Sequence, residues 1–141
     1  MMKKSFLKKL CLILVIALVF LSAGQSAWSG FQEGLDAARR GDYATALKEW
    51  KPLAELGDVN AQFNLGVMYY NGQGVPKDYK IAVEWFRKSA EQGYAKAQGN
   101  VGWMYAKGLG VPKDYKLAVK WYLIYVVQSI RNKWKQRWTK E

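Results

Sequence analysis

Residues 61–86 read AQFNLGVMYYNGQGVPKDYKIAVEWF, and residues 97–122 read AQGNVGWMYAKGLGVPKDYKLAVKWY. The two stretches match at a constant offset of 36 residues, so that Ala61 corresponds to Ala97 and Asp78 to Asp114. A fixed period of roughly 20 to 50 residues is typical of a stacked repeat, in which a single unit cannot bury its apolar side alone. The sequence therefore predicts a stack of similar units.

One unit has the pattern of two antiparallel helices. Ala61, Leu65 and Met68 are spaced so that they share one side of a helix. Gly72, in the turn that follows, is placed to end that helix in the left-handed conformation. The second helix cannot begin before Pro76, and Asp78 is a suitable N-cap for it. Each unit is therefore expected to be a helical hairpin.

Gly66 lies inside the first helix of its unit, and Gly102 has the same place in the next unit. Glycine in a helix interior costs about 1 kcal/mol relative to alanine. Its repetition predicts that another part of the backbone approaches closely at both positions.

The first unit contains the pattern A-x-x-x-L-G-x-x-Y-x-x-G-x-G-V-x-x-D-Y-x-x-A-x-x-W, and the second unit repeats it with Val101 in place of the leucine. In the first unit its residues are Ala61, Leu65, Gly66, Tyr69, Gly72, Gly74, Val75, Asp78, Tyr79, Ala82 and Trp85. This pattern resembles the Sel1-like repeat, a relative of the tetratricopeptide repeat. The resemblance implies an all-α, right-handed α-solenoid of antiparallel helical hairpins. It also implies a protein-binding scaffold, usually without catalysis of its own.

Residues 1–27 have the pattern of a secretory signal peptide. A continuous apolar run over residues 10–21 follows four basic residues, Lys3, Lys4, Lys8 and Lys9. The run is shorter than the roughly 20 residues that cross a bilayer, so cleavage and a periplasmic or secreted location are expected. An uncleaved membrane anchor is the alternative. Cys11 lies in this segment, and without it the chain has no thiol for a disulfide.

The rest of the chain is expected to form one repeat domain over residues 28–130, followed by a basic tail with tryptophans over residues 131–141. The domain comprises an N-terminal half repeat and two full repeats, at residues 31–57, 61–96 and 97–130. In the half repeat, Tyr43 and Ala46 match Tyr79 and Ala82 at the same offset, but the long glycine loop is missing.

The composition disfavours an enzyme. The chain has no histidine, which removes the commonest general base and the commonest zinc ligand. We expect no metal, no cofactor and no catalytic residues. Some proteins with such repeats are associated with β-lactam chemistry, which ordinarily uses Ser-x-x-Lys. The matches here are residues 5–8, inside the signal, and the related spacing Thr45 to Lys48. A β-lactam or cell-wall hydrolase is a distant alternative.

The charge distribution disfavours nucleic acid as a partner. The net charge is +11, but four of the cations lie in residues 3–9, and residues 131–141 contribute a further +4. Between residues 31 and 130, the two signs are evenly mixed, without the basic face that nucleic-acid binding requires.

The predicted function is an exported scaffold that binds a protein or peptide in a concave groove lined by the first helices of the repeats. By analogy with tetratricopeptide repeats, the groove residues are Phe63, Asn64, Val67, Tyr70, Asn100 and Trp103. The two equivalent asparagines offer a donor and an acceptor each to a peptide backbone, and the apolar side chains offer pockets. Gly99, opposite Phe63, is expected to leave room for a ligand side chain. Ordinary contacts between repeats are the alternative explanation.

The C-terminal segment departs from the repeat. Ile130, Trp134 and Trp138 lie four residues apart and share one side of a continued helix, and Arg131 and Lys135 flank them. One interpretation is a capping helix whose tryptophans cover the last repeat. A second is a peripheral membrane helix that would anchor an envelope protein. A third is a docking surface for another chain, or the end of an array cut short.

Overall fold

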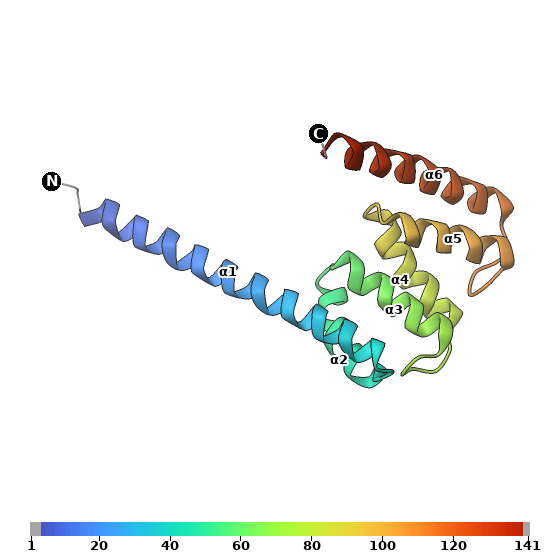
Figure 1. Cartoon of the computed structure of the whole chain (residues 1–141), viewed down its shortest axis with the longest axis horizontal. Helices are drawn as coiled ribbons and strands as arrows, with labels where there is room; N and C mark the ends of the chain where they lie inside the picture. Colours follow the sequence, from blue (N-terminus) through green and yellow to red (C-terminus); the bar gives the residue numbers. More distant parts are fainter. Residues whose placement is uncertain (1–3, 140–141) are drawn as a thin grey trace.

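The computed structural model describes residues 4–139, with the side chains of residues 9–16 and 26–139. Figure 1 shows the described chain as six helices without strands, which confirms the all-α prediction. The helices are α1 (Lys4–Arg39), α2 (Tyr43–Glu55), α3 (Val59–Asn71), α4 (Tyr79–Glu91), α5 (Ala95–Lys107) and α6 (Tyr115–Trp138).

The six helices form a solenoid of three hairpins. Each helix packs mainly on its neighbours in the sequence, and the hairpins are α1 with α2, α3 with α4, and α5 with α6. The N-terminal part of α1 extends away from the stack as one long rod (Figure 1). Residues 4–27 and the first helix of the stack are thus one continuous helix. None of the helices in the described part of the chain is long and apolar enough to cross a membrane.

Aspartates begin the second helix of every hairpin, as predicted. Each accepts a hydrogen bond from the backbone N–H three residues later, which satisfies one of the free donors at the helix start. These aspartates are Asp42, Asp78 and Asp114, with donor–acceptor distances of 3.1, 3.0 and 3.0 Å. Hydrogen bonds from the side chain and the backbone of Thr45 hold the pKa of Asp42 below its usual value.

A glycine in the first helix of each full repeat faces an aromatic ring of the second helix. A Cβ atom on Gly66 would lie 2.5 Å from the ring of Phe86, and one on Gly102 would lie 3.2 Å from the ring of Tyr122. The carbonyl oxygen of Ala118 is equally close to Gly102. The predicted approach of another part of the backbone is therefore confirmed at Gly102 and wrong at Gly66, where the neighbour is a side-chain ring.

The first hairpin has the same contact, which the repeat period does not reveal. A Cβ atom on Gly34 would overlap the indole of Trp50, and Trp50 corresponds to Phe86 at the usual offset. The spacing from Gly34 to Gly66 is shorter than the repeat period, because the connection between α1 and α2 lacks the long glycine loop. The half repeat is thus a complete hairpin with a shorter turn.

The glycine loop of each full repeat contacts the preceding hairpin. Gly74 has φ of +69°, and a Cβ there would lie 2.7 Å from that of Tyr43, at the start of α2. Gly110 has φ of +70°, and a Cβ there would overlap the backbone of Tyr79, at the start of α4. Glycine is required at both positions by the positive φ and by the lack of space. We call these two contacts the loop clamps.

We expect Gly66→Ala to lower the free energy of unfolding by about 1–2 kcal/mol, because overpacking against Phe86 outweighs the gain in helix propensity. Gly102→Ala has neighbours at 3.2 Å and is expected to change it by less than about 1 kcal/mol. Chemical denaturation followed by circular dichroism measures both. The double variant Gly66→Ala with Phe86→Leu makes room for the methyl group and is the control. Equal stability of Gly66→Ala and the wild type would contradict the packing argument.

Two buried glutamines join successive hairpins. Gln62 donates to the carbonyl of Ala54 at 3.1 Å, and Gln98 donates to that of Ala90 at the same distance. The two sites differ at the side-chain oxygen. The side-chain oxygen of Gln62 accepts a hydrogen bond from the Gln92 amide at 2.8 Å. The side-chain oxygen of Gln98 has no hydrogen-bond partner among the described residues. A buried acceptor without a partner destabilises a fold.

Replacement of these glutamines by leucine is expected to have unequal effects. Gln62→Leu removes two hydrogen bonds and should lower the free energy of unfolding by about 1–2 kcal/mol. Gln98→Leu removes one hydrogen bond together with an unpaired oxygen, and should stay within about 1 kcal/mol of the wild type. Urea melts of the matched pair measure the difference, and a larger loss in Gln98→Leu would contradict the role given to the unpaired oxygen.

Candidate functional site

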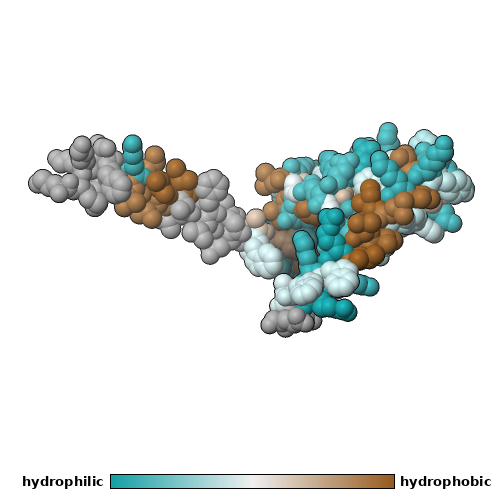
Figure 2. Space-filling model, turned by 90° about the horizontal axis from the view of Figure 1, so that it is seen from above, coloured by the Kyte–Doolittle hydropathy of each residue, from teal (hydrophilic) through white to brown (hydrophobic). Residues whose placement is uncertain are grey.

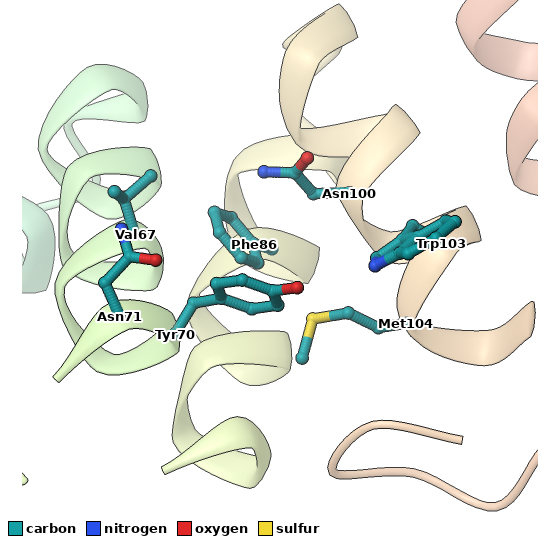
Figure 3. Close-up of a pocket in the computed structure, with 7 residues that line it drawn as sticks. All are labelled: Val67, Tyr70, Asn71, Phe86, Asn100, Trp103 and Met104. Atoms are coloured by element: carbon teal, nitrogen blue, oxygen red, sulfur yellow. The ribbon is translucent and has the colours of Figure 1, made fainter. Parts of the chain in front are cut away.

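A cavity of about 450 Å³ lies between the second and third hairpins. We call it junction cavity 2. Figure 3 shows that side chains from α3 and α5 point toward one another across it, with Phe86 of α4 between them. Its lining residues are Val67, Tyr70, Asn71, Phe86, Asn100, Trp103 and Met104.

A second cavity, of about 300 Å³, lies between the first and second hairpins. We call it junction cavity 1. Its lining residues are Leu35, Ala38, Arg39, Tyr43, Trp50, Asn64, Val67, Met68 and Gln73.

The two cavities are the same site at successive junctions. Asn64, Val67 and Met68 of cavity 1 correspond to Asn100, Trp103 and Met104 of cavity 2 at the repeat offset. The residues of α1 that line cavity 1 correspond to residues of α3 that line cavity 2, at the shorter offset that relates Gly34 to Gly66. At that offset Leu35, Ala38 and Arg39 correspond to Val67, Tyr70 and Asn71. Every lining position of cavity 2 thus has its counterpart in cavity 1.

The side chains give the two cavities different chemistry. Cavity 2 is aromatic with two neutral amides, and Trp103 at its edge is 45% exposed, with the Lys107 ammonium 4.7 Å from its ring centre. Cavity 1 is lined by Arg39 and by a polar pair in which the Gln73 amide donates to the Tyr43 hydroxyl at 2.8 Å. An apolar or aromatic ligand group fits cavity 2, and a polar one fits cavity 1.

The predicted groove residues divide between three places. Val67, Tyr70, Asn100 and Trp103 line cavity 2 together, and Asn64 lines the equivalent cavity 1. Phe63 lines neither cavity, which corrects its assignment.

The half-buried ring of Phe63 instead packs against the core between repeats, with its centre 5.6 Å from that of Phe86 and 5.0 Å from that of Tyr94. The space expected at Gly99 is also taken. The ring of Tyr125 lies 3.7 Å from where a Cβ atom of Gly99 would be, so this ring already occupies part of the space beside Gly99.

Several lining residues were missed by the sequence reasoning. Asn71 and Met104 line cavity 2, and the whole α1 side of cavity 1 was absent from the predicted groove. A comparison of residues 28–40 with the repeat at offsets shorter than the main period would have aligned Gly34 with Gly66. The equivalence of Arg39 with Asn71 follows from that alignment.

The C-terminal segment continues α6 to Trp138, and residues 140 and 141 lie outside the described part. Trp134 and Trp138 are 53% and 69% exposed, and Ile130, Arg131 and Lys135 are exposed as well. The tryptophans therefore do not cover the last repeat, and the capping interpretation is wrong. With 24 residues against the 13 of α5, α6 extends past its partner helix, so the stripe stays in solvent.

Comparison with known families gives matches to the Sel1 repeat over residues 59–94 and 95–124, which correspond to α3 with α4 and α5 with the first part of α6. The chain contains two Sel1 repeats. The Sel1-repeat fold is a scaffold for protein interactions, as the resemblance implied.

Similar proteins include two solved Sel1-repeat structures, each 38% identical to this chain. One, from Oxalobacter formigenes, matches with a TM-score of 0.65 over 67% of this chain and 39% of the other. The second is c5321, a protective antigen of uropathogenic Escherichia coli strains, with a TM-score of 0.70 over 72% of this chain and 23% of the antigen.

Two proteins of Helicobacter pylori are also similar. "Putative beta-lactamase HcpC" is 37% identical over 75 residues, which are 53% of this chain and 26% of HcpC. Cysteine rich protein B has the same fold at 22% identity, with a TM-score of 0.57 over 72% of this chain and 87% of the other. This Sel1-repeat chain thus spans well under half the length of HcpC, of c5321 and of the Oxalobacter formigenes protein.

Proposed function

We propose that the protein is an exported interaction scaffold that binds an extended segment of a partner protein across the two junction cavities. The observation that carries this proposal is the repetition of one cavity at both junctions with different lining chemistry. A ligand chain that follows the stack would meet an amide from Asn64 and then one from Asn100. Each amide can donate to and accept from a peptide backbone.

The chemistry of the cavities suggests what the segment contains. Cavity 2 is within the size range of ligand pockets and presents Tyr70, Phe86 and Trp103, which favour an aromatic or aliphatic anchor. At cavity 1, Arg39 is paired with Asp36 at 3.0 Å on the surface and remains accessible, so an acidic or amide side chain is favoured there.

Hydrolysis of a β-lactam is the second candidate function, and the name of HcpC is the observation that favours it. Thr45 and Lys48 have a related spacing, but the backbone N–H of Thr45 donates to Asp42 at the start of α2. Ser5 and Lys8 have side chains outside the described residues. The scaffold is the proposal that the described geometry supports better.

Peptides selected from a random library on the purified protein test the scaffold proposal. Trp103→Ala and Asn100→Ala should each weaken binding of the selected peptides by tenfold or more, because they remove a partly exposed anchor and a backbone contact. The melting temperature should stay within a few degrees of the wild type. Calorimetric titration measures the affinities.

Trp138→Ala and Asn132→Ala remove the same residue types from exposed positions on α6 and are the matched controls. Unchanged affinity in Trp103→Ala and Asn100→Ala, or an equal loss in the controls, would contradict binding at the cavities.

Export is tested by fusing residues 1–27 to a reporter enzyme that is active only outside the cytoplasm. We expect reporter activity and a shortened product, because the segment has a basic start, an apolar centre and small residues near its end. Insertion of two arginines into residues 10–21 should abolish both. A full-length product retained in the membrane would support the uncleaved anchor instead.

A further inference from the structure

The outer side of α6 is apolar along most of the helix. Its exposed apolar residues recur at helical spacing, and we call them the α6 outer face: Leu123, Val126, Val127, Ile130, Trp134 and Trp138. At about 100° per residue they fall within one side of the helix, away from the buried Ala118. Figure 2 shows brown apolar side chains gathered on the helical body, with teal side chains beside them.

Part of this face, together with the neighbouring Val119, is the side of α6 on which a further hairpin would stack. Val119 is 56% exposed, whereas its counterpart Val83 in α4 is 5% exposed, because α5 packs on α4. Val126 and its counterpart Ala90 differ in the same way. A further hairpin stacked on α6 would cover Val119 and Val126.

The remainder of the face is not explained by stacking. Leu123 and Val127 correspond to Arg87 and Glu91, which are charged and exposed on α4 even though α5 covers that helix. A further hairpin would therefore leave Leu123 and Val127 in water. Exposed apolar residues that lie next to one another on one side of a helix are typical of an interaction site, and here the partner would be something other than a repeat.

The charges on α6 select the kind of partner. Within α6 all the charged residues are basic, and they are Lys116, Lys120, Arg131, Lys133, Lys135 and Arg137. Lys133 and Arg137 border the outer face on one side, and Lys120 and Arg131 border it on the other. A second copy of α6 placed on this face would oppose cations to cations, which disfavours a symmetric dimer. An anionic surface is complementary to it.

The tryptophans specify a lipid surface among the anionic ones. Trp134 and Trp138 have large amphipathic rings. Tryptophan is favoured at the boundary between lipid headgroups and acyl chains. The guanidinium of Arg137 lies 5.5 Å from the ring centre of Trp134, so a cation and a ring are presented together.

We propose that α6 lies in the interface of an anionic lipid bilayer, with the α6 outer face toward the acyl chains and the flanking cations at the headgroups. An exposed apolar stripe with basic borders can bind a membrane surface in this way, through buried apolar area and electrostatic attraction. This membrane contact is independent of the junction cavities, which are lined by residues before α6.

A single environment-sensitive label tests the proposal on the full chain. Cys11 is the one cysteine, so Cys11→Ser with Val127→Cys places the label on the outer face, and Cys11→Ser with Asn132→Cys places it on the opposite side. The probe is a vesicle of phosphatidylcholine with one quarter phosphatidylglycerol. The label at position 127 should shift to the blue and lose access to an aqueous quencher, whereas that at position 132 should not. Because the label reports on α6, vesicle binding through the apolar start of α1 does not imitate this result.

The second arm tests the charges. A variant with glutamine at four basic positions should bind the vesicles tenfold or more weakly, as measured by the label at position 127. The four positions are Arg131, Lys133, Lys135 and Arg137. Without these changes, 0.5 M salt should also weaken vesicle binding. Pure phosphatidylcholine should give little response.

Four results would overturn the proposal. Both labels could remain in water on the bound vesicles, or both could be shielded equally. If the label at position 127 is shielded in buffer without vesicles, and this shielding increases with protein concentration, a second copy covers the face. An equal response to phosphatidylcholine would remove the anionic surface from the proposal.

Discussion

The contact between a helix glycine and an aromatic ring governs the geometry of the stack. Gly34, Gly66 and Gly102 each admit the ring of the second helix, which lets the two helices of a hairpin approach closely. Glycine in a helix interior costs about 1 kcal/mol, and this cost is offset by burial of Trp50 and Phe86. Because the contact recurs in every hairpin, the hairpins have similar shapes and successive junctions can be alike.

The junction cavities follow from that regularity. Phe86 fills the gap at Gly66 on one side and forms part of cavity 2 on the other, so a packing residue also shapes the candidate binding site. Trp50 has the same two contacts in the first hairpin. Variation among cavities is left to residues that the packing does not constrain, such as Arg39 and Trp103. A solenoid can thereby change its ligand preference at one junction without changing its fold.

The sequence predicted the parts of this structure that are local. The aspartate caps and the left-handed Gly72 depend on a few neighbouring residues, and the repeat places them. Prediction failed where the outcome depends on residues distant in the sequence. Helical spacing put Phe63 near the groove. The spacing could not show that the rings of Phe86 and Tyr94 would pack against Phe63. Likewise, the stripe through Trp134 was visible, whereas its exposure depends on how far α5 extends beneath α6.

The loop clamps give the stack a direction. The loop of each repeat presses on the start of the second helix of the hairpin before it, so Tyr43 and Tyr79 are half-buried by the repeats that follow them. Tyr115 occupies the same place at the start of α6 and is exposed, because no later loop covers it among the described residues. Each hairpin is therefore locked by its successor. Local opening should start at α6 and proceed toward α1, so that amide exchange grows slower from the C-terminal helix toward the middle of the stack.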